Sequence, residues 1–347
     1  MKIKTAIACV VVSIVLMAFA EKGGSLFHVP AGWPVPHYDF AKNKLTQEKV
    51  DLGRLLFYDP ILSRDSTISC ESCHSRFVAF THVDHALSHG INDRIGKRNA
   101  PALMNLAWQR SFMWDGAINH LDMQALAPIT NALEMDEQLP NVLEKLRTQS
   151  RYRFMFERAY GDTTISTERM LRAISSFMVT LVSSNSKYDQ VKRGEANFTR
   201  QEENGYALFL MHCNACHTEP LFTNGEFSRN GLAQDAVLQD LGRFAVTLQP
   251  EDSFLFKVPT LRNIAYSKPY MHDGRMKRLS DVLKHYASLH GQGVHMNNTL
   301  DQLPSFSSEQ QVDITSFLLT LSDSTFVMNP AFSYPREIIA SLTKESN

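Results

Sequence analysis

Two copies of the pattern Cys-x-x-Cys-His constrain this chain of 347 residues more than any other feature of its sequence. The pattern occupies Cys70–His74 and again Cys213–His217. Two thiols at this spacing can add to the vinyl groups of a haem, and the adjacent histidine can bind the iron as its proximal ligand. A structural disulfide needs no histidine at that place. The pattern therefore predicts two covalently bound c-type haems, attached at Cys70, Cys73, His74, Cys213, Cys216 and His217.

The first twenty residues differ from the rest of the chain. Two lysines precede an apolar run over 6–19, and a small-x-small pattern ends at Ala20. This arrangement is typical of a secretory signal peptide, so residues 1–20 are expected to be cleaved and the protein to be periplasmic. The alternative is an uncleaved anchor that would keep the protein on the membrane. Cleavage removes Cys9 and leaves every remaining cysteine in a haem motif.

The net charge and the length of the chain limit its possible partners and its number of domains. The 35 basic and 36 acidic residues almost cancel, so no nucleic-acid partner is expected. The chain is longer than one core usually is, which favours two domains. The polar stretch 183–197 is the best candidate for a boundary. We therefore expect an N-terminal domain over 21–190 and a C-terminal domain over 191–347.

A similar helix is predicted before each motif. The stretch 46–57 opens with an N-cap threonine and has apolar residues at helical spacing. Thr199 and Glu202 form a capping box that begins the helix leading to the second motif. Gly-x-x-Leu-Phe recurs in these helices at Gly53 and Gly205. The chain thus contains an internal duplication of a helix followed by Cys-x-x-Cys-His.

Other segments also favour helices. Apolar stripes at helical spacing run over 167–181 and 307–321. A further helix is predicted over 279–290, with Ser280 as its N-cap and Tyr286 on one apolar face. Strand signals are sparse and broken by Gly, Pro and Asn. The sequence therefore predicts a mainly α protein with long loops.

The ligand opposite each proximal histidine decides what each iron does. Two strong ligands favour electron transfer, whereas an open position admits a small oxidant such as peroxide. For the second haem, Tyr286 is a candidate, with Met271 and His285 as competitors. Three histidines closely follow the first motif, and none of them stands out: His82, His85 and His89.

The segment downstream of the first motif mixes apolar and polar residues, as the wall of a cofactor pocket does. It includes Trp108, Trp114, Gln124 and Glu134. A carboxylate held there can move a proton between the oxygens of peroxide and so assist O–O cleavage. The alternative is that Glu134 is an ordinary surface or helix-end acid.

The sequence resembles the bacterial dihaem cytochrome c peroxidases and the related MauG-type enzymes from about Pro34 to Ser322. The resemblance implies two cytochrome c-like helical domains, each wrapping one c-type haem. It places the active-site haem in the N-terminal domain, the electron-transfer haem in the C-terminal domain and a calcium ion between them. The motifs that carry it are LGRLLFYDPILSRDSTISCESCH, RNAPALMNLAW, FMWDG, QALAPITNALEM, CNACH and FKVPTLRNIAYSKPYMHDGRMKRLSDVLKHY.

The resemblance also implies roles for single residues. Glu134 matches the glutamate that assists peroxide cleavage, Gln124 matches a glutamine of the same pocket, and Trp114 matches the tryptophan between the haems. The calcium ligands would be the side chain of Asn99 and main-chain carbonyls at Ser267 and Pro269, since this hard cation prefers oxygen.

Two positions depart from the typical peroxidases and agree with the MauG-type branch. Ile91 stands where a peroxidase histidine closes the first haem, so this haem should be open to peroxide unless His89 substitutes. Tyr286 stands where peroxidases have a methionine. A phenolate stabilises higher oxidation states of iron more than a thioether does, which should lower the potential of the second haem.

The leading expectation is a peroxidase that reduces hydrogen peroxide with electrons from a small cytochrome c or similar redox protein. The second is a MauG-type enzyme that oxidises side chains of a partner protein. The third is an electron carrier without catalysis, against which Glu134 and Gln124 argue because a closed redox haem has no use for a proton-transfer pocket. A homodimer is left open by the sequence.

Overall fold

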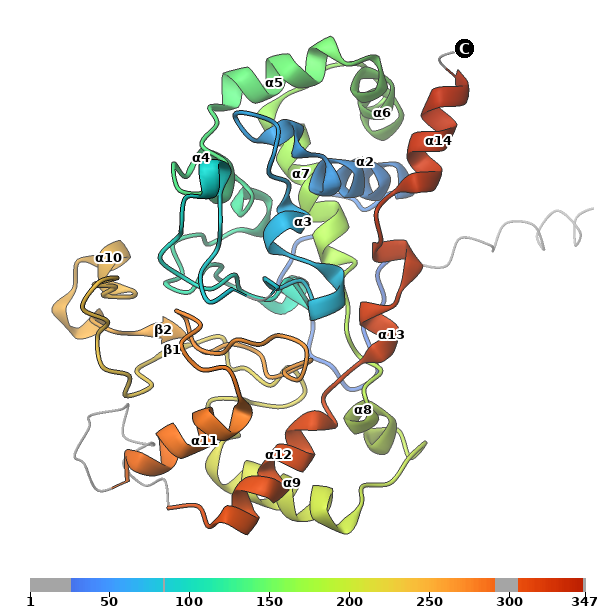
Figure 1. Cartoon of the computed structure of the whole chain (residues 1–347). Coiled ribbons are helices and arrows are strands. Elements are labelled where there is room, and N and C mark those ends of the chain that lie inside the picture. The colour runs from blue at the N-terminus through green and yellow to red at the C-terminus, as the bar shows by residue number, and fades with distance from the viewer. Residues whose placement is uncertain (1–25, 84, 291–304, 346–347) are drawn as a thin grey trace, which may run out of the picture.

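The structure, a computed structural model, describes residues 26–83, 85–290 and 305–345. The expected signal peptide, 1–20, lies outside these ranges. Within them the chain is mainly helical with long loops, as predicted (Figure 1). The helices are α2 (Gln47–Tyr58), α3 (Cys70–Cys73), α4 (Leu126–Thr130), α5 (Leu139–Thr148), α6 (Ser150–Tyr160), α7 (Thr167–Val179), α8 (Lys187–Lys192), α9 (Arg200–His212), α10 (Phe244–Thr247), α11 (Leu279–Ser288), α12 (Ser308–Leu319), α13 (Ser324–Val327) and α14 (Arg336–Glu345).

The first core is built around the crossing of α2 and α7. Thr46 caps α2 by accepting a hydrogen bond from the backbone of Lys49, so the predicted N-cap is confirmed. The helices meet at Gly53, where a Cβ atom would lie 1.8 Å from a main-chain oxygen of α7. One turn later, the rings of Phe57 and Phe177 lie 5.3 Å apart. The glycine lets the two backbones approach closely enough for these rings to pack.

The second core repeats this crossing with α9 and α12. The capping box of Thr199 and Glu202 begins α9, as predicted. A Cβ atom at Gly205 would lie 1.9 Å from a main-chain oxygen of α12. The rings of Phe209 and Phe317 are 5.0 Å apart. The duplication expected from the sequence is therefore present in the packing of both cores.

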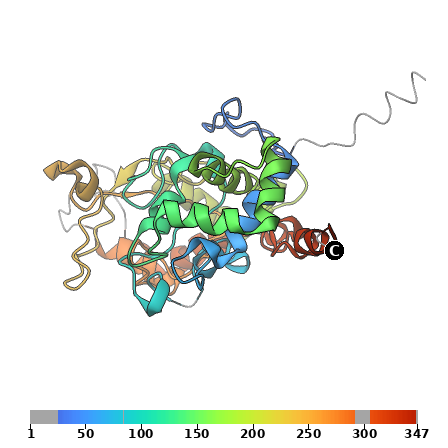
Figure 2. The same cartoon turned by 90° about the horizontal axis from the view of Figure 1, so that it is seen from above.

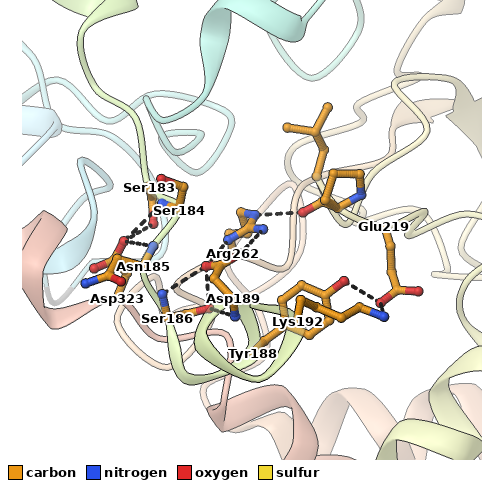
Figure 3. A network of polar contacts seen from close by, with 12 residues as sticks. Ser183, Ser184, Asn185, Ser186, Tyr188, Asp189, Lys192, Glu219, Arg262 and Asp323 are labelled. Atoms are coloured by element: carbon orange, nitrogen blue, oxygen red, sulfur yellow. Dashed lines mark hydrogen bonds and ion pairs between the residues drawn. The ribbon is translucent and has the colours of Figure 1, made fainter. Parts of the chain in front are cut away.

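The polar stretch between the cores is held by side-chain contacts (Figure 3). Asp323, whose side chain is buried, accepts hydrogen bonds from Ser183 Oγ and from the backbone N–H groups of Ser184 and Asn185 at 2.9–3.1 Å. Farther along, α13 and α14 return to the first core (Figures 1 and 2) and contribute buried apolar side chains from Phe326 to Leu342. The C-terminal segment therefore packs against the part of the molecule that holds the first motif.

The helix predicted over 279–290 is present as α11, but its predicted N-cap and its predicted C-terminal end were wrong. The N-cap of α11 is Arg278 in extended conformation, not Ser280, which lies inside the helix. The reason is that the carbonyl of Arg278 already accepts the first hydrogen bonds of the helix, from Asp281 and Val282. The predicted helix 279–290 ends at Ser288.

The strands of the described residues form one small sheet. β1 (Phe227–Ser228) pairs antiparallel with β2 (Phe256–Lys257). The register brings Phe227 opposite Lys257 and Ser228 opposite Phe256. No helix in the ranges that the structure describes is long and apolar enough to cross a membrane.

Candidate active site

The first motif forms a single helical turn that presents His74. Ser69 and Ser72 cap this turn, α3, and the backbone N–H of His74 bonds to the carbonyl of Cys70 at 2.9 Å. The Nδ1 atom of His74 lies 2.8 Å from the carbonyl oxygen of Phe80. Because a carbonyl only accepts, Nδ1 carries the hydrogen and Nε2 keeps its lone pair. Burial lowers the pKa of His74 to about 4, so the imidazole is neutral, as a metal ligand must be.

The second motif has the same geometry at the end of α9. The backbone N–H of His217 bonds to the carbonyl of Cys213 at 2.9 Å. Its Nδ1 atom lies 3.2 Å from the carbonyl oxygen of Phe222 and 3.1 Å from that of Pro259. Burial lowers the pKa of His217 to about 4 as well. Both motifs thus offer a neutral histidine with Nε2 available to iron.

The cysteine thiols fit covalent attachment better than redox or zinc chemistry. The motif cysteines of the described residues form no disulfide. Burial raises the pKa of Cys70 and Cys213 to about 12 and that of Cys73 to about 11. Reactive or metal-binding thiols instead have a lowered pKa. Nowhere in the described ranges do three His, Cys, Asp or Glu side chains group so as to hold a metal ion.

A large cavity adjoins the second motif. Its volume is about 750 Å³, within the range of pockets that enclose a small molecule or cofactor. Cys213, Cys216 and His217 line one side, and residues of the first half, including Trp114 and Gln124, line another. Apolar side chains complete the wall: Phe209, Leu221, Val258, Leu261, Ile264, Val282, Leu283, Phe306, Ile314 and Leu318. The residues present fit a large, mostly apolar group such as a haem.

The three candidates for the distal ligand of the second haem differ in the hydrogen bonds that their ligand atoms form. The sulfur of Met271 accepts a hydrogen bond from Asn230 Nδ2 at 3.5 Å, and His285 Nε2 donates to Asn230 O at 2.7 Å. Tyr286 lines the cavity, and no described residue forms a hydrogen bond with its phenol oxygen. Burial, followed by the charges of Cys213 and Cys216, raises the pKa of Tyr286. Of the three candidates, the phenol of Tyr286 is therefore the one whose ligand atom forms no such hydrogen bond. Because its pKa is raised, it would ionise only when a bound cation stabilises the phenolate.

The carboxyl group of Glu134 lies close to the first motif. Its charge helps to raise the pKa of Cys73, after burial. Glu134 Oε1 accepts a hydrogen bond from Asn131 Nδ2 at 2.8 Å. Burial also raises the pKa of Glu134 itself. A partly buried carboxyl group beside a cofactor motif is suited to proton transfer.

The position of the missing histidine is occupied by a core residue. Ile91 is wholly buried, and its backbone N–H donates to the carbonyl of Glu134 at 2.8 Å. The preceding Gly90 allows this approach, since a Cβ atom there would lie 2.1 Å from the carbonyl oxygen of Leu133. Ile91 therefore places no ligating atom beside Glu134.

The histidines that follow the first motif form a cluster that sequence reasoning did not foresee. The ring centroids of His85 and His89 are 4.5 Å apart, and that of His82 lies 5.2 and 6.0 Å from them. Cys73 Sγ lies 3.5 Å from the carbonyl oxygen of His89. The spacing of these histidines along the chain was the only available signal.

The residues expected to bind calcium come from the first and the second half of the chain and lie together in the structure. Asn99 Nδ2 donates to the carbonyl of Pro269 at 2.7 Å, and Ser267 lines the same cavity. Asn99 Oδ1 is buried and has no hydrogen-bond partner among the described residues. A hard cation would satisfy this oxygen together with neighbouring carbonyls. Trp114 adjoins the group, since its indole N–H donates to the carbonyl of Asn99 at 2.8 Å.

Sequence reasoning gave no role to Lys257, although this lysine lies in the segment FKVPTLRNIAYSKPYMHDG. Its Nζ donates to Gln109 Oε1 at 2.6 Å and to the carbonyl of Ser111 at 2.8 Å. Burial lowers its pKa to about 8. Its backbone N–H donates to the carbonyl of Trp114. A partly buried amino group thus lies near the tryptophan, and only its tertiary contacts reveal it. Trp108 is a buried core residue that also lines the cavity, and its indole N–H donates to the carbonyl of Pro34.

Comparisons with known proteins agree with this geometry. A family profile described as di-haem cytochrome c peroxidase matches residues 47–197. The methylamine utilization protein MauG of Methylophilus methylotrophus is 34% identical over 305 residues, covering 85% of this chain and 87% of that protein. The cytochrome c551 peroxidase of Nitrosomonas europaea is 31% identical over 293 residues, 83% of each chain. The crystal structure of a MauG-like protein associated with microbial copper homeostasis matches with a TM-score of 0.78 and 30% identity, over 89% of this chain and 98% of that one.

Proposed function

Because the chain belongs to the dihaem cytochrome c peroxidase and MauG family, a family of haem peroxidases that carry two haems, we propose that it reduces hydrogen peroxide with electrons from a small redox protein such as cytochrome c. In this proposal the domain over 21–190 holds the active-site haem. The domain over 191–347 holds the electron-transfer haem, apart from its C-terminal segment, which packs against the first core. Residues 1–20 direct export to the periplasm.

The observation that supports this proposal is the contrast between the two motifs. A carboxyl group, that of Glu134, lies near the first motif, and Tyr286 lines the cavity of the second. When bound, the haems supply the iron that binds peroxide and passes electrons. Glu134 Oε2 takes a proton from one peroxide oxygen and delivers it to the other, which leaves as water. Asn131 holds Oε1 and so orients the carboxyl group for this transfer.

The remaining residues support the transfer of charge between the halves. Tyr286 lines the cavity of the second motif and would offer the bound haem an anionic oxygen ligand, which would favour the higher oxidation states of its iron. Trp114 and Gln124, from the first half of the chain, line the cavity of the second motif, and the indole of Trp114 is fixed by its bond to the carbonyl of Asn99. Calcium bound by Asn99, Ser267 and Pro269 would hold this tryptophan in place from the other side. Overall, two electrons from the donor and two protons convert one peroxide to two water molecules.

A MauG-type reaction, the oxidation of side chains on a partner protein, is the second candidate function. It is favoured by Ile91 and Tyr286, the two positions at which the chain departs from typical peroxidases. Neither residue excludes peroxide turnover, because both act on the ligation of iron and not on the choice of donor.

Steady-state peroxide turnover with reduced cytochrome c tests the proposal. We expect turnover in the wild type and a loss of about 10²-fold or more in Glu134→Gln, which keeps the shape of the side chain but cannot accept a proton. A wild type with two haems and no turnover would favour protein modification. Full activity in Glu134→Gln would remove the proton-transfer role, and a protein unreactive toward peroxide would be an electron carrier.

The ligand assignment has a separate test. Tyr286→Phe removes the phenol oxygen and should change the absorption and EPR spectra of the second haem alone, since Tyr286 lines the cavity of the second motif. Met271→Leu is the matched control, because Met271 already bonds to Asn230. An altered spectrum in the control and none in Tyr286→Phe would assign the ligand to the methionine.

A further inference from the structure

A buried ion pair anchors the loop that follows the second motif (Figure 3). The side chain of Arg262 is 0% exposed and donates from Nη1 and Nη2 to the carboxylate of Asp189 at 2.9 and 2.8 Å. Its Nε donates to the carbonyl of Pro220 at 2.8 Å. Burying a guanidinium group costs free energy that is offset only when charge and hydrogen bonds are matched in this way. The pair therefore fixes the position of Pro220 relative to α8.

The anchored loop carries a hydrogen-bond acceptor of the proximal histidine. Phe222, two residues after Pro220, accepts from His217 Nδ1 at 3.2 Å. Phe222 is wholly buried and has a φ of 55°. A non-glycine residue holds this conformation only where its surroundings enforce it. Here Thr260 Oγ1 donates to the carbonyl of Leu221 at 2.6 Å, which adds a second contact to that of the ion pair.

The same loop is anchored at its start by other side chains of α8. Glu219 accepts a hydrogen bond from the hydroxyl of Tyr188 and lies 3.6 Å from Lys192 Nζ (Figure 3). Asp189 is itself held by Ser186, whose N–H and hydroxyl both donate to it. The loop therefore cannot shift unless the contacts with α8 break.

We propose that the Arg262–Asp189 pair is a positioning device for His217 and lowers the reduction potential of the second haem; this inference rests on the proposed function above. A histidine that donates its Nδ1 hydrogen to a fixed carbonyl is a more basic ligand, and a more basic ligand favours ferric iron. His217 Nδ1 shares its hydrogen between the carbonyls of Phe222 and Pro259. Loosening the loop weakens the bond to Phe222 and leaves the one to Pro259. The reduction potential of the second haem then rises, while that of the first, whose histidine bonds to Phe80, does not change.

Potentiometric titration of the holoprotein, followed by absorption, tests this inference. Arg262→Lys keeps the positive charge, but a lysine cannot form the bidentate ion pair with Asp189 and the hydrogen bond to Pro220 at the same time. We expect a positive shift in the potential of the second haem only. The matched control is Arg54→Lys, because Arg54 is also a buried arginine paired with a carboxylate, that of Glu337, but lies on α2 of the first core. The control should leave the second potential unchanged.

Thr260→Val is the milder variant if Arg262→Lys fails to retain its second haem. It removes the bond to the carbonyl of Leu221 and the bond that Thr260 Oγ1 accepts from the backbone N–H of Arg262, but it keeps the ion pair with Asp189. It should therefore produce a smaller shift in the same direction. Unchanged potentials of the second haem in the variants that retain it would overturn the inference. Haem content and peroxide turnover of the wild type test the proposed function separately, so a protein with two haems but no turnover would refute the reaction and not the positioning role.

Discussion

Glu134 differs from a surface glutamate in its environment. Its carboxyl group is partly buried near Cys73, and one of its oxygens accepts a hydrogen bond from Asn131. Burial disfavours the charged form and raises the pKa above the ordinary value of 4.5. A carboxylate with a raised pKa is a better proton acceptor near neutral pH than an ordinary one.

The pH dependence of turnover follows from this shift. Only the carboxylate form of Glu134 can accept a proton, so kcat/KM should fall as the pH decreases through the raised pKa. We expect an acidic limb centred above 4.5 in the wild type and none in Glu134→Gln.

A matched control for this profile is Glu144→Gln. The side chain of Glu144 is 69% exposed on α5, so its loss should leave the profile as it is in the wild type. An acidic limb that persists in Glu134→Gln would assign the titrating group to another residue.

The two helix crossings are the elements that support both haem motifs. In each, a glycine admits the partner backbone and a phenylalanine one turn later packs on its counterpart. α9 leads directly into Cys213, so its crossing angle determines where the second motif lies. A change at Gly205 should therefore affect the second haem more than the first.

Gly205→Ala places a methyl group against the main chain of α12. We expect a loss of about 2 kcal/mol or more in the free energy of unfolding, because a backbone clash forces the helices apart. Chemical denaturation with absorption at the haem bands would measure it. Asn204→Ala, on the exposed side of the same helix, is the control and should be neutral or slightly stabilising. A neutral Gly205→Ala would contradict the close crossing.

At the scale of the whole molecule, contacts from both halves meet around Asn99. Its backbone N–H donates to the carbonyl of His272, and its side chain donates to Pro269. These residues lie in the second half of the chain. A cation at the unpartnered Asn99 Oδ1 would add a further connection between the halves.

Removing calcium should therefore lower the melting temperature. At a calcium concentration 100 times the Kd, binding to the folded state alone contributes about 2.7 kcal/mol. Thermal unfolding before and after treatment with EGTA measures this, and Asn99→Ala should abolish the difference while Asn204→Ala should retain it. An equal melting temperature with and without the chelator in the wild type would argue against the ion.

Local rules account for much of this protein. The caps at Thr46 and Thr199 and the duplicated helices were predicted correctly because their signals lie within a few residues of each other. Haem attachment was predicted because thiol and imidazole must be adjacent in the chain. The N-cap of α11 was predicted wrongly, since Ser280 satisfied the residue preference but Arg278 already accepted the first hydrogen bonds.

Long-range contacts were decided by the tertiary structure alone. Arg262 and Asp189 are 73 residues apart in the chain, and no periodicity relates them. The same holds for the contacts of Lys257 with Gln109 and Ser111 and for the hydrogen bond between Met271 and Asn230. The roles of Glu134 and the calcium residues came from family resemblance, because local pattern cannot distinguish a buried acid from an exposed one. The two motifs thus determine the cofactor chemistry, whereas the packing around them determines how each histidine and carboxyl group is held.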